Sequence, residues 1–345
     1  MFDIVHPAHA LFFHHAIERL RANGDEVMIV SREKKDITTL VLDRLGHEHR
    51  PISAARSGAA GMFLELGLRD LAMLRVARSF KPHVMVGFGG ISISHVGWLC
   101  RIPSMSFYDT EIAKLQIGIT LPFITEWHVP ETYTGPVPRK GLFRFPGTRH
   151  LAYFHPDNFR PDRDRAMAAG LDPERDNFLI RTVGWSANHD IGKSGLSGPD
   201  LIRLATRLSE MGRVHISAED VLPPELEGFR YRGDVLDLHH LMAHCRAYVG
   251  ESATMAAEAA VLGVPAIYAI NDYRGFIDHL AKIGLVIRSD GTVDDLLRGV
   301  DQALARSVSD WRELRDEAAT RWTNVSSYVY DAIDRYRPQG RAAAA

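Results

Sequence analysis

The chain alternates between short apolar runs and longer segments whose apolar positions recur every three or four residues. The first pattern predicts buried strands and the second predicts helices. In the first half we expect strands at 3–5, 26–30, 84–86 and 105–108, and helices at 10–23, 36–45, 62–80 and 92–100. In the second half we expect strands at 178–183, 214–217, 229–231, 247–249, 266–270 and 285–287, and helices at 200–211, 236–245, 292–305 and 310–336, with one more ending at 262. This alternation is typical of α/β proteins built on doubly wound parallel sheets.

A proline-rich segment interrupts the alternation in the middle of the chain. Seven prolines lie between residues 122 and 163, where they break any long helix or strand, so we interpret this segment as a hinge. We therefore expect two Rossmann-like domains, 1–155 and 156–320, which face each other across a cleft. A helix at 321–337 can return to the first domain, and 338–345 form a tail.

Composition narrows the class of protein. With 345 residues, of which 46% are hydrophobic and 24% charged, the chain suits a soluble protein of two domains. The 41 basic and 43 acidic residues leave a formal charge of −2, which disfavours nucleic acid as the main partner. Cys100 and Cys245 lie in or beside apolar segments, as reduced core thiols do, and we find no secretion signal or membrane-spanning segment. We expect a cytoplasmic protein.

The segment 248–270 carries the most informative pattern. An apolar strand ends at Gly250, a short helix follows, and a second strand completes one parallel βαβ step. Ser252 or Thr254 can cap the helix, and the backbone from Ser252 through Ala253 to Thr254 then lies at its positive end. Free amides at a helix start form an anion site, so we expect phosphate to bind there.

Glu258 is the only charged residue of that helix. It follows Thr254 by four residues, which puts it on the same face and about 6 Å further along the axis. A helix that is apolar on all sides is normally buried, and a buried glutamate needs a partner. We interpret Glu258 as a ligand of ribose hydroxyls beside a bound diphosphate. The alternative is a solvent-facing residue on a packed helix.

Candidate catalytic groups follow the strands of the first half. We expect His9 in the loop after the first strand, where the positive end of the next helix would keep its imidazole neutral and able to accept a proton. Alternatively, His6 and His9 only cap the loop and the helix. Asp109 and Glu111 follow the strand that ends at 108. They could orient an acceptor hydroxyl or act as the base, or they could be no more than the acidic residues that are common at the start of a helix.

Glycines follow the strand at 84–86. Gly89 and Gly90 belong to a run, 87–90, that predicts a tight strand-to-helix turn with close approach of the backbone. Ser92 occupies the last position of the GxGxxG pattern, so we expect no nicotinamide or flavin cofactor.

A polar loop follows the first strand of the second half. His189 and Asp190, with Arg181 in the preceding strand, could contact a phosphate or act as acid or base. A solvated loop with a capping aspartate is the alternative.

The sequence contains no convincing arrangement of metal ligands. His239, His240 and His244 share one apolar helix without an HExxH arrangement, and the one Asp-x-Asp, at 162–164, lies in the proline-rich segment and not after a strand. We therefore predict chemistry that needs no metal.

The segment 62–81 mixes apolar residues with arginines and a lysine. The favoured interpretation is a helix packed on the sheet with a solvated edge. An amphipathic basic helix can also rest on anionic lipid, which would suit a lipid-linked acceptor.

Three stretches resemble known families. Residues 81–111 are similar to part of the bacterial N-acetylglucosaminyltransferase that makes lipid II, and 250–267 resemble the donor-binding segment which that enzyme shares with UDP-N-acetylglucosamine 2-epimerase. HPAHALFF at 6–13 and ESATMAAEAAVLGVPAI at 251–267 resemble an uncharacterised family associated with polysaccharide gene sets. All belong to the GT-B superfamily.

The resemblance implies a function. It implies an inverting glycosyltransferase that uses a nucleotide-diphosphate sugar, with the diphosphate at Ser252 to Thr254, the ribose at Glu258, and a glycan or lipid-linked acceptor on the first domain. It also implies a catalytic role for His9, because the lipid II enzyme has a histidine at the equivalent place. A 2-epimerase is the alternative, although those enzymes carry Arg-Pro-Glu where this chain has His6-Pro7-Ala8-His9. A nucleotide-sugar-binding protein without catalysis is a further alternative.

Overall fold

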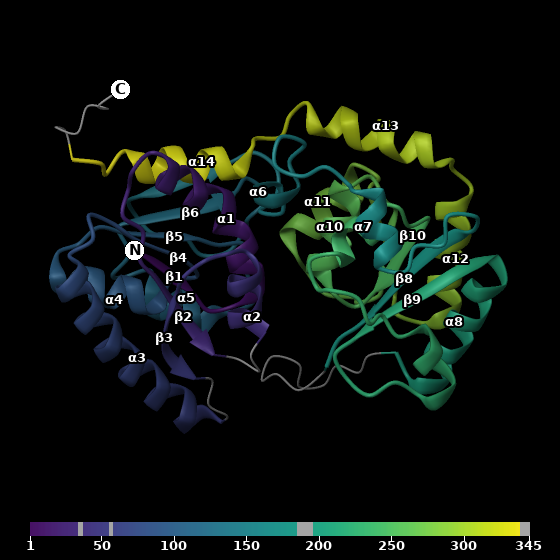
Figure 1. Ribbon diagram of the computed structural model, residues 1–345, viewed down its shortest axis with the longest axis horizontal. Coiled ribbons are helices and arrows are strands. Elements are labelled where there is room, and N and C mark those ends of the chain that lie inside the picture. The colour runs from purple at the N-terminus through teal and green to yellow at the C-terminus, as the bar shows by residue number, and fades with distance from the viewer. Residues whose placement is uncertain (34–36, 55–57, 185–195, 339–345) are drawn as a thin grey trace. The chain divides into compact units, whose positions relative to one another are not determined.

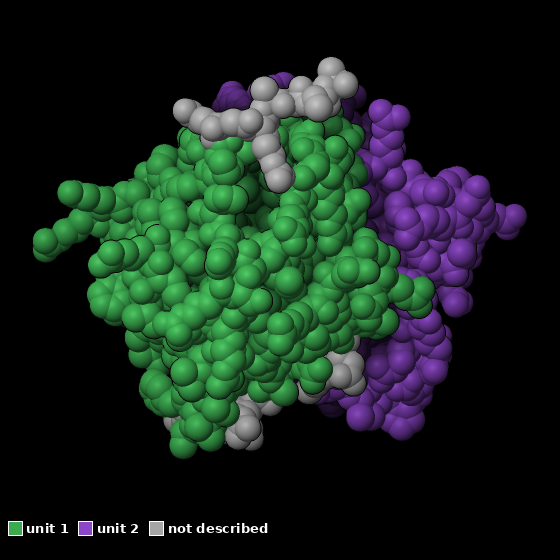
Figure 2. Space-filling view, turned by 60° about the vertical axis from the view of Figure 1, so that its left-hand side comes forward, with its two compact units in different colours: residues 1–158, 323–345 green, residues 159–322 purple. Residues whose placement is uncertain are grey.

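The computed structural model describes residues 1–33, 37–54, 58–184 and 196–338. The chain divides into two compact units, Met1–Asn158 with Thr323–Ala345, and Phe159–Trp322 (Figures 1 and 2). The first unit is therefore built from two separate stretches of sequence.

The first unit contains a parallel sheet of seven strands in the order β3-β2-β1-β4-β5-β6-β7. The strands are β1 (Phe2–Ile4), β2 (Ile29–Glu33), β3 (Arg50–Ala54), β4 (Met85–Phe88), β5 (Ser104–Phe107), β6 (Glu126–Pro130) and β7 (Leu142–Phe145). The helices are α1 (Pro7–Ala22), α2 (Ile37–Arg44), α3 (Ala59–Phe80), α4 (Ile91–Cys100), α5 (Lys114–Thr120), α6 (Leu151–Phe154) and α14 (Val325–Asp334). The central strands β1, β4 and β5 are buried along their whole length, as strands covered on both faces are.

Most of the proline-rich segment is folded into the first unit, and the boundary between the two units lies near its end. It contains β6 and β7, which extend the first sheet, followed by α6 and α7 (Arg163–Ala168). Its prolines lie where each element ends: Pro130 is the last residue of β6, and Pro136 and Pro138 lie in the turn before β7. Proline is tolerated at strand ends and in turns, because no ladder hydrogen bond is lost there. The boundary between the units lies at Asn158 and Phe159.

The second unit contains a parallel sheet of five strands in the order β12-β11-β10-β8-β9. The strands are β8 (Asp176–Thr182), β9 (Gly212–Ala218), β10 (Ala247–Gly250), β11 (Ala266–Tyr268) and β12 (Val286–Arg288). The helices are α7, α8 (Gly198–Met211), α9 (Leu238–Met242), α10 (Ala253–Val261), α11 (Gly275–Lys282), α12 (Val293–Leu304) and α13 (Val308–Ala319), with a 3₁₀ helix at Pro224–Phe229. A core cluster that includes Phe178, Leu204, Val249 and Trp311 joins this sheet to its helices.

Both sheets have a point where the strand order reverses. In the first sheet it lies between β1 and β4, and in the second between β8 and β10. Open α/β sheets bind ligands beyond the carboxyl ends of their strands at such points. The predicted fold class, two Rossmann-like parallel-sheet domains, is confirmed. No helix in the described part of the chain is long and apolar enough to cross a membrane.

Several predicted elements differ from the structure. Strand β2 begins at Ile29 and not at Glu26, because Ile29 is the residue that pairs with Phe2 of β1. The expected strand at 229–231 is a single bridge between Ile216 and Arg230. Strand β3 and the helices α5 and α11 were not predicted, since each is short and only partly apolar.

The last predicted helix, 310–336, is two helices. It breaks at 320–324, where the Asn324 side chain accepts the Ser327 N–H and starts α14. Helix α13 belongs to the second unit and α14 to the first, where the Asn23 amide donates to the Tyr330 hydroxyl at 2.8 Å. The break therefore allows the chain to return to the first unit.

Candidate functional site

Helix α1 begins three residues earlier than expected, and this changes the place of His9. Pro7 occupies the first helical position, which its ring favours, and His6 is the N-cap, whose Nδ1 accepts the Ala8 N–H at 3.2 Å. His9 is therefore not in a loop, but in the first turn of α1, directly after β1. Part of the alternative interpretation is confirmed, because His6 does cap the helix.

His9 lies at the point where the order of the first sheet reverses. Its ring stacks on Phe88, the last residue of β4, with centroids 4.8 Å apart, and lies 5.5 Å from the ring of His6. Burial is the largest cause that lowers the pKa of His9 well below its ordinary value, and the positive charges of His6 and Arg149 add to it. The imidazole is neutral at pH 7, and its buried Nδ1 has no hydrogen-bond partner among the described residues.

Gly89 and Gly90 form the turn that the sequence predicted. Their φ angles are +74° and +37°, in the left-handed region that side chains disfavour. A Cβ on Gly89 would lie 2.2 Å from the Gln116 amide nitrogen, and one on Gly90 would lie 2.8 Å from Ile93. The backbone between β4 and α4 is therefore close to its neighbours, beside His9.

Asp109 and Glu111 follow β5, at the carboxyl ends of the strands of the first sheet. Asp109 is buried and forms an ion pair with Arg149, whose Nε lies 2.6 Å from its carboxylate. The carboxylates of Glu111 and Asp109 also act with burial to raise the pKa of Tyr133. Arg149 was missed by the sequence reasoning, because a single arginine in a segment interpreted as a hinge gives no pattern. The carboxyl ends of these strands therefore carry both the neutral imidazole of His9 and the ion-paired carboxylate of Asp109.

The second unit has the predicted helix start. Ser252 is the N-cap of α10, and its hydroxyl accepts the Met255 N–H at 3.3 Å. Ala253 and Thr254 are the first two helical residues, whose amides have no carbonyl within the helix to bond. Gly250 is required just before them, because a Cβ there would lie 2.6 Å from the Arg181 carbonyl oxygen.

Glu258 is buried, with 3% of its surface exposed, so the solvent-facing interpretation is wrong. One carboxylate oxygen lies 3.5 Å from Nε2 of His239 in α9, and the charge of Glu258 helps to raise the pKa of buried Tyr248. The sequence alone assigns His239 no function. Its role beside Glu258 became visible only when α9 and α10 were placed in the fold.

Two further side chains lie at the reversal point of the second sheet. Arg181 donates to the Ser217 hydroxyl at 2.8 Å and pairs with Glu219, so its guanidinium is held towards β9. Glu251, to which we gave no role, accepts the N–H groups of Val183 (2.9 Å) and Leu196 (2.6 Å). Glu251 therefore joins the loops that follow β8 and β10. His189 and Asp190 lie outside the described residues.

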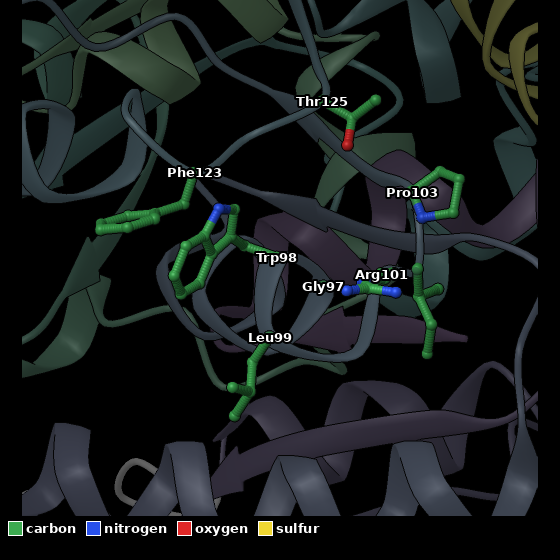
Figure 3. Close-up of a pocket in the computed structure, with 8 residues that line it drawn as sticks. Gly97, Trp98, Leu99, Arg101, Pro103, Phe123 and Thr125 are labelled. Atoms are coloured by element: carbon green, nitrogen blue, oxygen red, sulfur yellow. The ribbon is translucent and has the colours of Figure 1, made fainter.

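A pocket of about 600 Å³ lies at the amino ends of the strands of the first sheet (Figure 3). It is lined by the end of α4 and the start of β5, including Trp98, Leu99, Arg101 and Phe123. Because it lies at the amino ends of the strands, it is far from the place where His9, Asp109 and the glycine turn meet.

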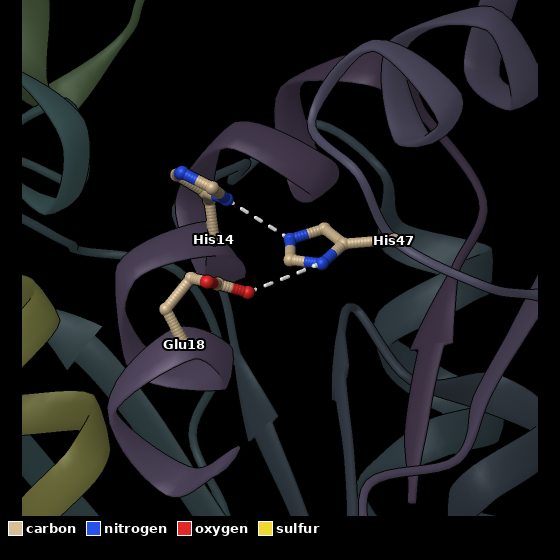
Figure 4. A group of neighbouring side chains, drawn as sticks. All are labelled: His14, Glu18 and His47. Carbon is tan, nitrogen blue, oxygen red and sulfur yellow. Dashed lines mark hydrogen bonds and ion pairs between the residues drawn. The ribbon is translucent and has the colours of Figure 1, made fainter. Parts of the chain in front are cut away.

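One group of side chains has the composition of a metal site. His14, Glu18 and His47 each offer one ligand atom within 4.8 Å of the others (Figure 4). They are joined by hydrogen bonds already: His14 Nδ1 lies 2.9 Å from His47 Nε2, and the Arg21 guanidinium lies 2.9 Å from His47 Nδ1. A guanidinium so close opposes a metal cation, and the interactions present account for the cluster.

Residues 1–143 match the family model described as "Protein of unknown function (DUF354)". No curated protein matches the chain. Solved structures match over almost its full length, with low sequence identity.

The UDP-GlcNAc 2-epimerase from Methanocaldococcus jannaschii is similar with a TM-score of 0.68 and 12% identity, over 97% of this chain and 99% of that one. The Neisseria meningitidis enzyme, bound to UDP-GlcNAc, has a TM-score of 0.63 and 11% identity, over 97% and 98% of the chains. The fold is GT-B-like. The spinosyn rhamnosyltransferase SpnG, complexed with thymidine diphosphate, is similar with a TM-score of 0.60 and 14% identity, over 96% and 99%. At these identities the likeness extends to the fold and not to the activity.

Proposed function

We propose that the protein is an inverting glycosyltransferase that transfers a sugar from a nucleotide diphosphate, UDP in our expectation, to a glycan or lipid-linked acceptor in polysaccharide or glycoconjugate biosynthesis. The donor binds the second unit and the acceptor binds the first. The reaction needs no metal and no cofactor besides the donor. A cytoplasmic setting belongs to the proposal and suits the free thiols of Cys100 and Cys245.

The observation that carries the proposal is the arrangement of α10. A nine-residue helix starts at the reversal point of the second sheet, and a buried carboxylate lies one turn inside it. The helix start favours the two phosphates, and the Glu258 carboxylate suits the ribose hydroxyls about 6 Å further along. His239, 3.5 Å from Glu258, would orient that carboxylate.

His9 is the proposed base. Its neutral imidazole accepts the proton of an acceptor hydroxyl, whose oxygen forms a bond to the anomeric carbon from the side opposite the leaving group. The bond from that carbon to the diphosphate breaks, and its electron pair remains on the phosphate oxygen at the start of α10. Asp109 orients the acceptor and His189 contacts the donor phosphates in this proposal, with Gly89, Gly90 and Glu111 on the acceptor side.

Paired measurements of binding and turnover test both roles. In calorimetry with UDP and UDP-GlcNAc, we expect Glu258→Gln to weaken UDP binding about tenfold or more, because a charge-assisted hydrogen bond is lost. Glu313→Gln, which changes an exposed glutamate of α13, should leave it unchanged. His9→Gln should keep UDP affinity and reduce donor turnover by about a hundredfold or more.

The result can contradict the proposal at either site. Unchanged UDP affinity in Glu258→Gln would remove the donor assignment. Full turnover in His9→Gln would show that another group is the base.

A 2-epimerase is the second candidate, because a carboxylate and a neutral imidazole, those of Asp109 and His9, follow strands at the same end of the first sheet. Elimination and re-addition at the sugar need acid and base groups, and Asp109 and His9 would offer them. UDP-GlcNAc incubated with the protein alone and followed by NMR distinguishes the two. Appearance of the manno epimer without an acceptor would establish the epimerase.

A further inference from the structure

Helix α3 buries charged residues and exposes apolar ones over much of its length. The residues that face the sheet there are Glu65 and Arg69, both buried. The residues that face solvent are apolar: Phe63 is 61% exposed, Leu68 is 48% exposed and Leu71 is 53% exposed. A helix that only packed on the sheet would show the opposite pattern. The packing interpretation that the sequence favoured therefore does not account for this face.

The buried charges on α3 are fully engaged within the first unit. Glu65 accepts two hydrogen bonds from Arg32, at 2.5 and 2.8 Å. Arg69 pairs with Asp3 of β1 and donates to the Ser53 hydroxyl at 2.6 Å. These contacts hold α3 on the sheet, so the exposed leucines contribute little to its attachment.

The exposed residues form one stripe. Leu64, Leu68, Leu71, Arg75 and Arg78 follow one another at intervals of three or four, which puts them on the same side of the helix. We call this stripe, with Phe63, the α3 face. Figure 1 shows α3 at the outer edge of the first unit, beside α4. The end of α4, which packs beside α3, carries Trp98, Leu99 and Arg101, which are also exposed. These three residues line the pocket of Figure 3.

The α3 face is positively charged where it is not apolar. Arg75, Arg78 and Lys81 are exposed, and no carboxylate of the described residues forms an ion pair with them. The acidic residues of α3 are both engaged elsewhere, Glu65 with Arg32 and Asp70 with His95 at 2.8 Å. The face thus offers large apolar side chains and net positive charge together.

We propose that the α3 face binds the surface of an anionic lipid bilayer. The leucines and Phe63 enter the boundary between headgroups and acyl chains, while Arg75 and Arg78 bind the lipid phosphates. A second copy of the chain suits the face less well, because the face has no carboxylate to pair with the partner's arginines. Exposed apolar residues that are contiguous and bordered by polar ones often mark an interaction site.

This docking goes beyond the proposed function and does not depend on it. If the protein transfers sugar, bilayer binding would bring a lipid-linked acceptor to the first unit. The docking is measured without any sugar nucleotide, so its failure and the failure of the transferase assignment are separate results.

Vesicle sedimentation tests the docking. We expect the untagged protein to sediment with vesicles of equal parts phosphatidylglycerol and phosphatidylcholine, and not with pure phosphatidylcholine, with release at high salt. Phe63→Glu with Leu68→Glu, and separately Arg75→Glu with Arg78→Glu, should each weaken binding at least about tenfold. The matched control, Met167→Glu with Val221→Glu, changes exposed apolar residues of the second unit and should bind as the parent does.

The variants alter exposed positions, and unchanged thermal unfolding and circular dichroism verify that each is folded. Equal binding by all variants, or no binding to either vesicle, would overturn the proposal. So would light scattering that shows a dimer in the parent protein and a monomer in the Phe63 and Leu68 variant, because the face would then join two copies.

Discussion

At the scale of single residues, the candidate site depends on two groups whose neighbours come from distant parts of the chain. Glu258 was recognisable as an isolated charge on an apolar helix, because pattern alone shows that. Its contact with His239 was not, because 19 positions separate the two residues and no periodicity links α9 to α10. For His9, a neutral imidazole was expected from the helix dipole, whereas burial is the larger cause.

Histidines also determine how the stability of the first unit depends on pH. Burial is the largest cause that lowers the pKa of His14, His15 and His47 to about 4. In the unfolded chain they titrate near 6.5, so the unfolded state binds more protons than the folded state between these values. Their contribution to stability is therefore present above about pH 6.5 and is lost as the pH falls towards 4.

We expect the free energy of unfolding to fall between pH 7 and pH 4.5 in urea denaturation. His14→Gln and His47→Gln should each make this fall less steep, because one group that gains a proton on unfolding is removed. The exposed His83→Gln should keep the parent slope. An unchanged slope in both buried variants would show that other groups determine the acid sensitivity.

At the scale of elements, the sequence located most strands and helices but not the residues where they begin. Pro7 and the capping side chain of His6 start α1 three residues early, and this moved His9 from a loop into a helix. Side-chain capping by histidine has no strong sequence signal, so the apolar period alone put the start at Ala10. The βαβ step around α10 was predicted well, because its apolar strand, Ser252 cap and terminal glycine all indicate the same boundaries.

The end of β10 gives a test at this scale. Gly250→Ala would put a Cβ 2.6 Å from the Arg181 carbonyl oxygen and 2.7 Å from the Tyr248 hydroxyl, so the strand must shift. We expect a loss of about 1–3 kcal/mol in the free energy of unfolding, together with weaker UDP binding as the start of α10 moves. Thermal and urea denaturation measure the first effect, and calorimetry measures the second.

Gly228→Ala is the matched control, since a Cβ there would meet no heavy atom within 4 Å. It should cost little stability and leave UDP affinity unchanged. Equal effects of the two substitutions would show that the close approach at Gly250 is not what requires glycine.

At the scale of the whole molecule, the chain crosses from the first unit to the second and returns. The return is made by α14, whose Tyr328 hydroxyl lies 2.7 Å from Nδ1 of His128 in β6. The Tyr336 hydroxyl donates to Glu126 at 2.8 Å, and this bond and the bond from His128 help lower the pKa of Glu126. The strands β6 and β7 of the proline-rich segment are therefore the ones that α14 stabilises.

We expect Tyr328→Ala to reduce the stability of the first unit by about 2–3 kcal/mol, because a packed ring and a partly buried hydrogen bond are lost. Hydrogen exchange followed by mass spectrometry should show faster exchange in β6 and β7 and unchanged exchange in β8 to β12. Asp331→Ala, an exposed position of α14, should match the parent. Faster exchange across both units would mean that they unfold together.

The sequence by itself determined the α/β class, the two sheets and the Ser252-capped start of α10, because these follow from local periods, caps and turns. Only the tertiary structure decided that the proline-rich segment contributes two strands to a seven-stranded sheet, that Arg149 pairs with Asp109 and His239 with Glu258, and that Leu64, Leu68 and Leu71 of α3 face outward. The physical reason is the range of the interactions. Local preference acts over a few residues, whereas strand order, burial and ion pairs join residues that are far apart in the chain.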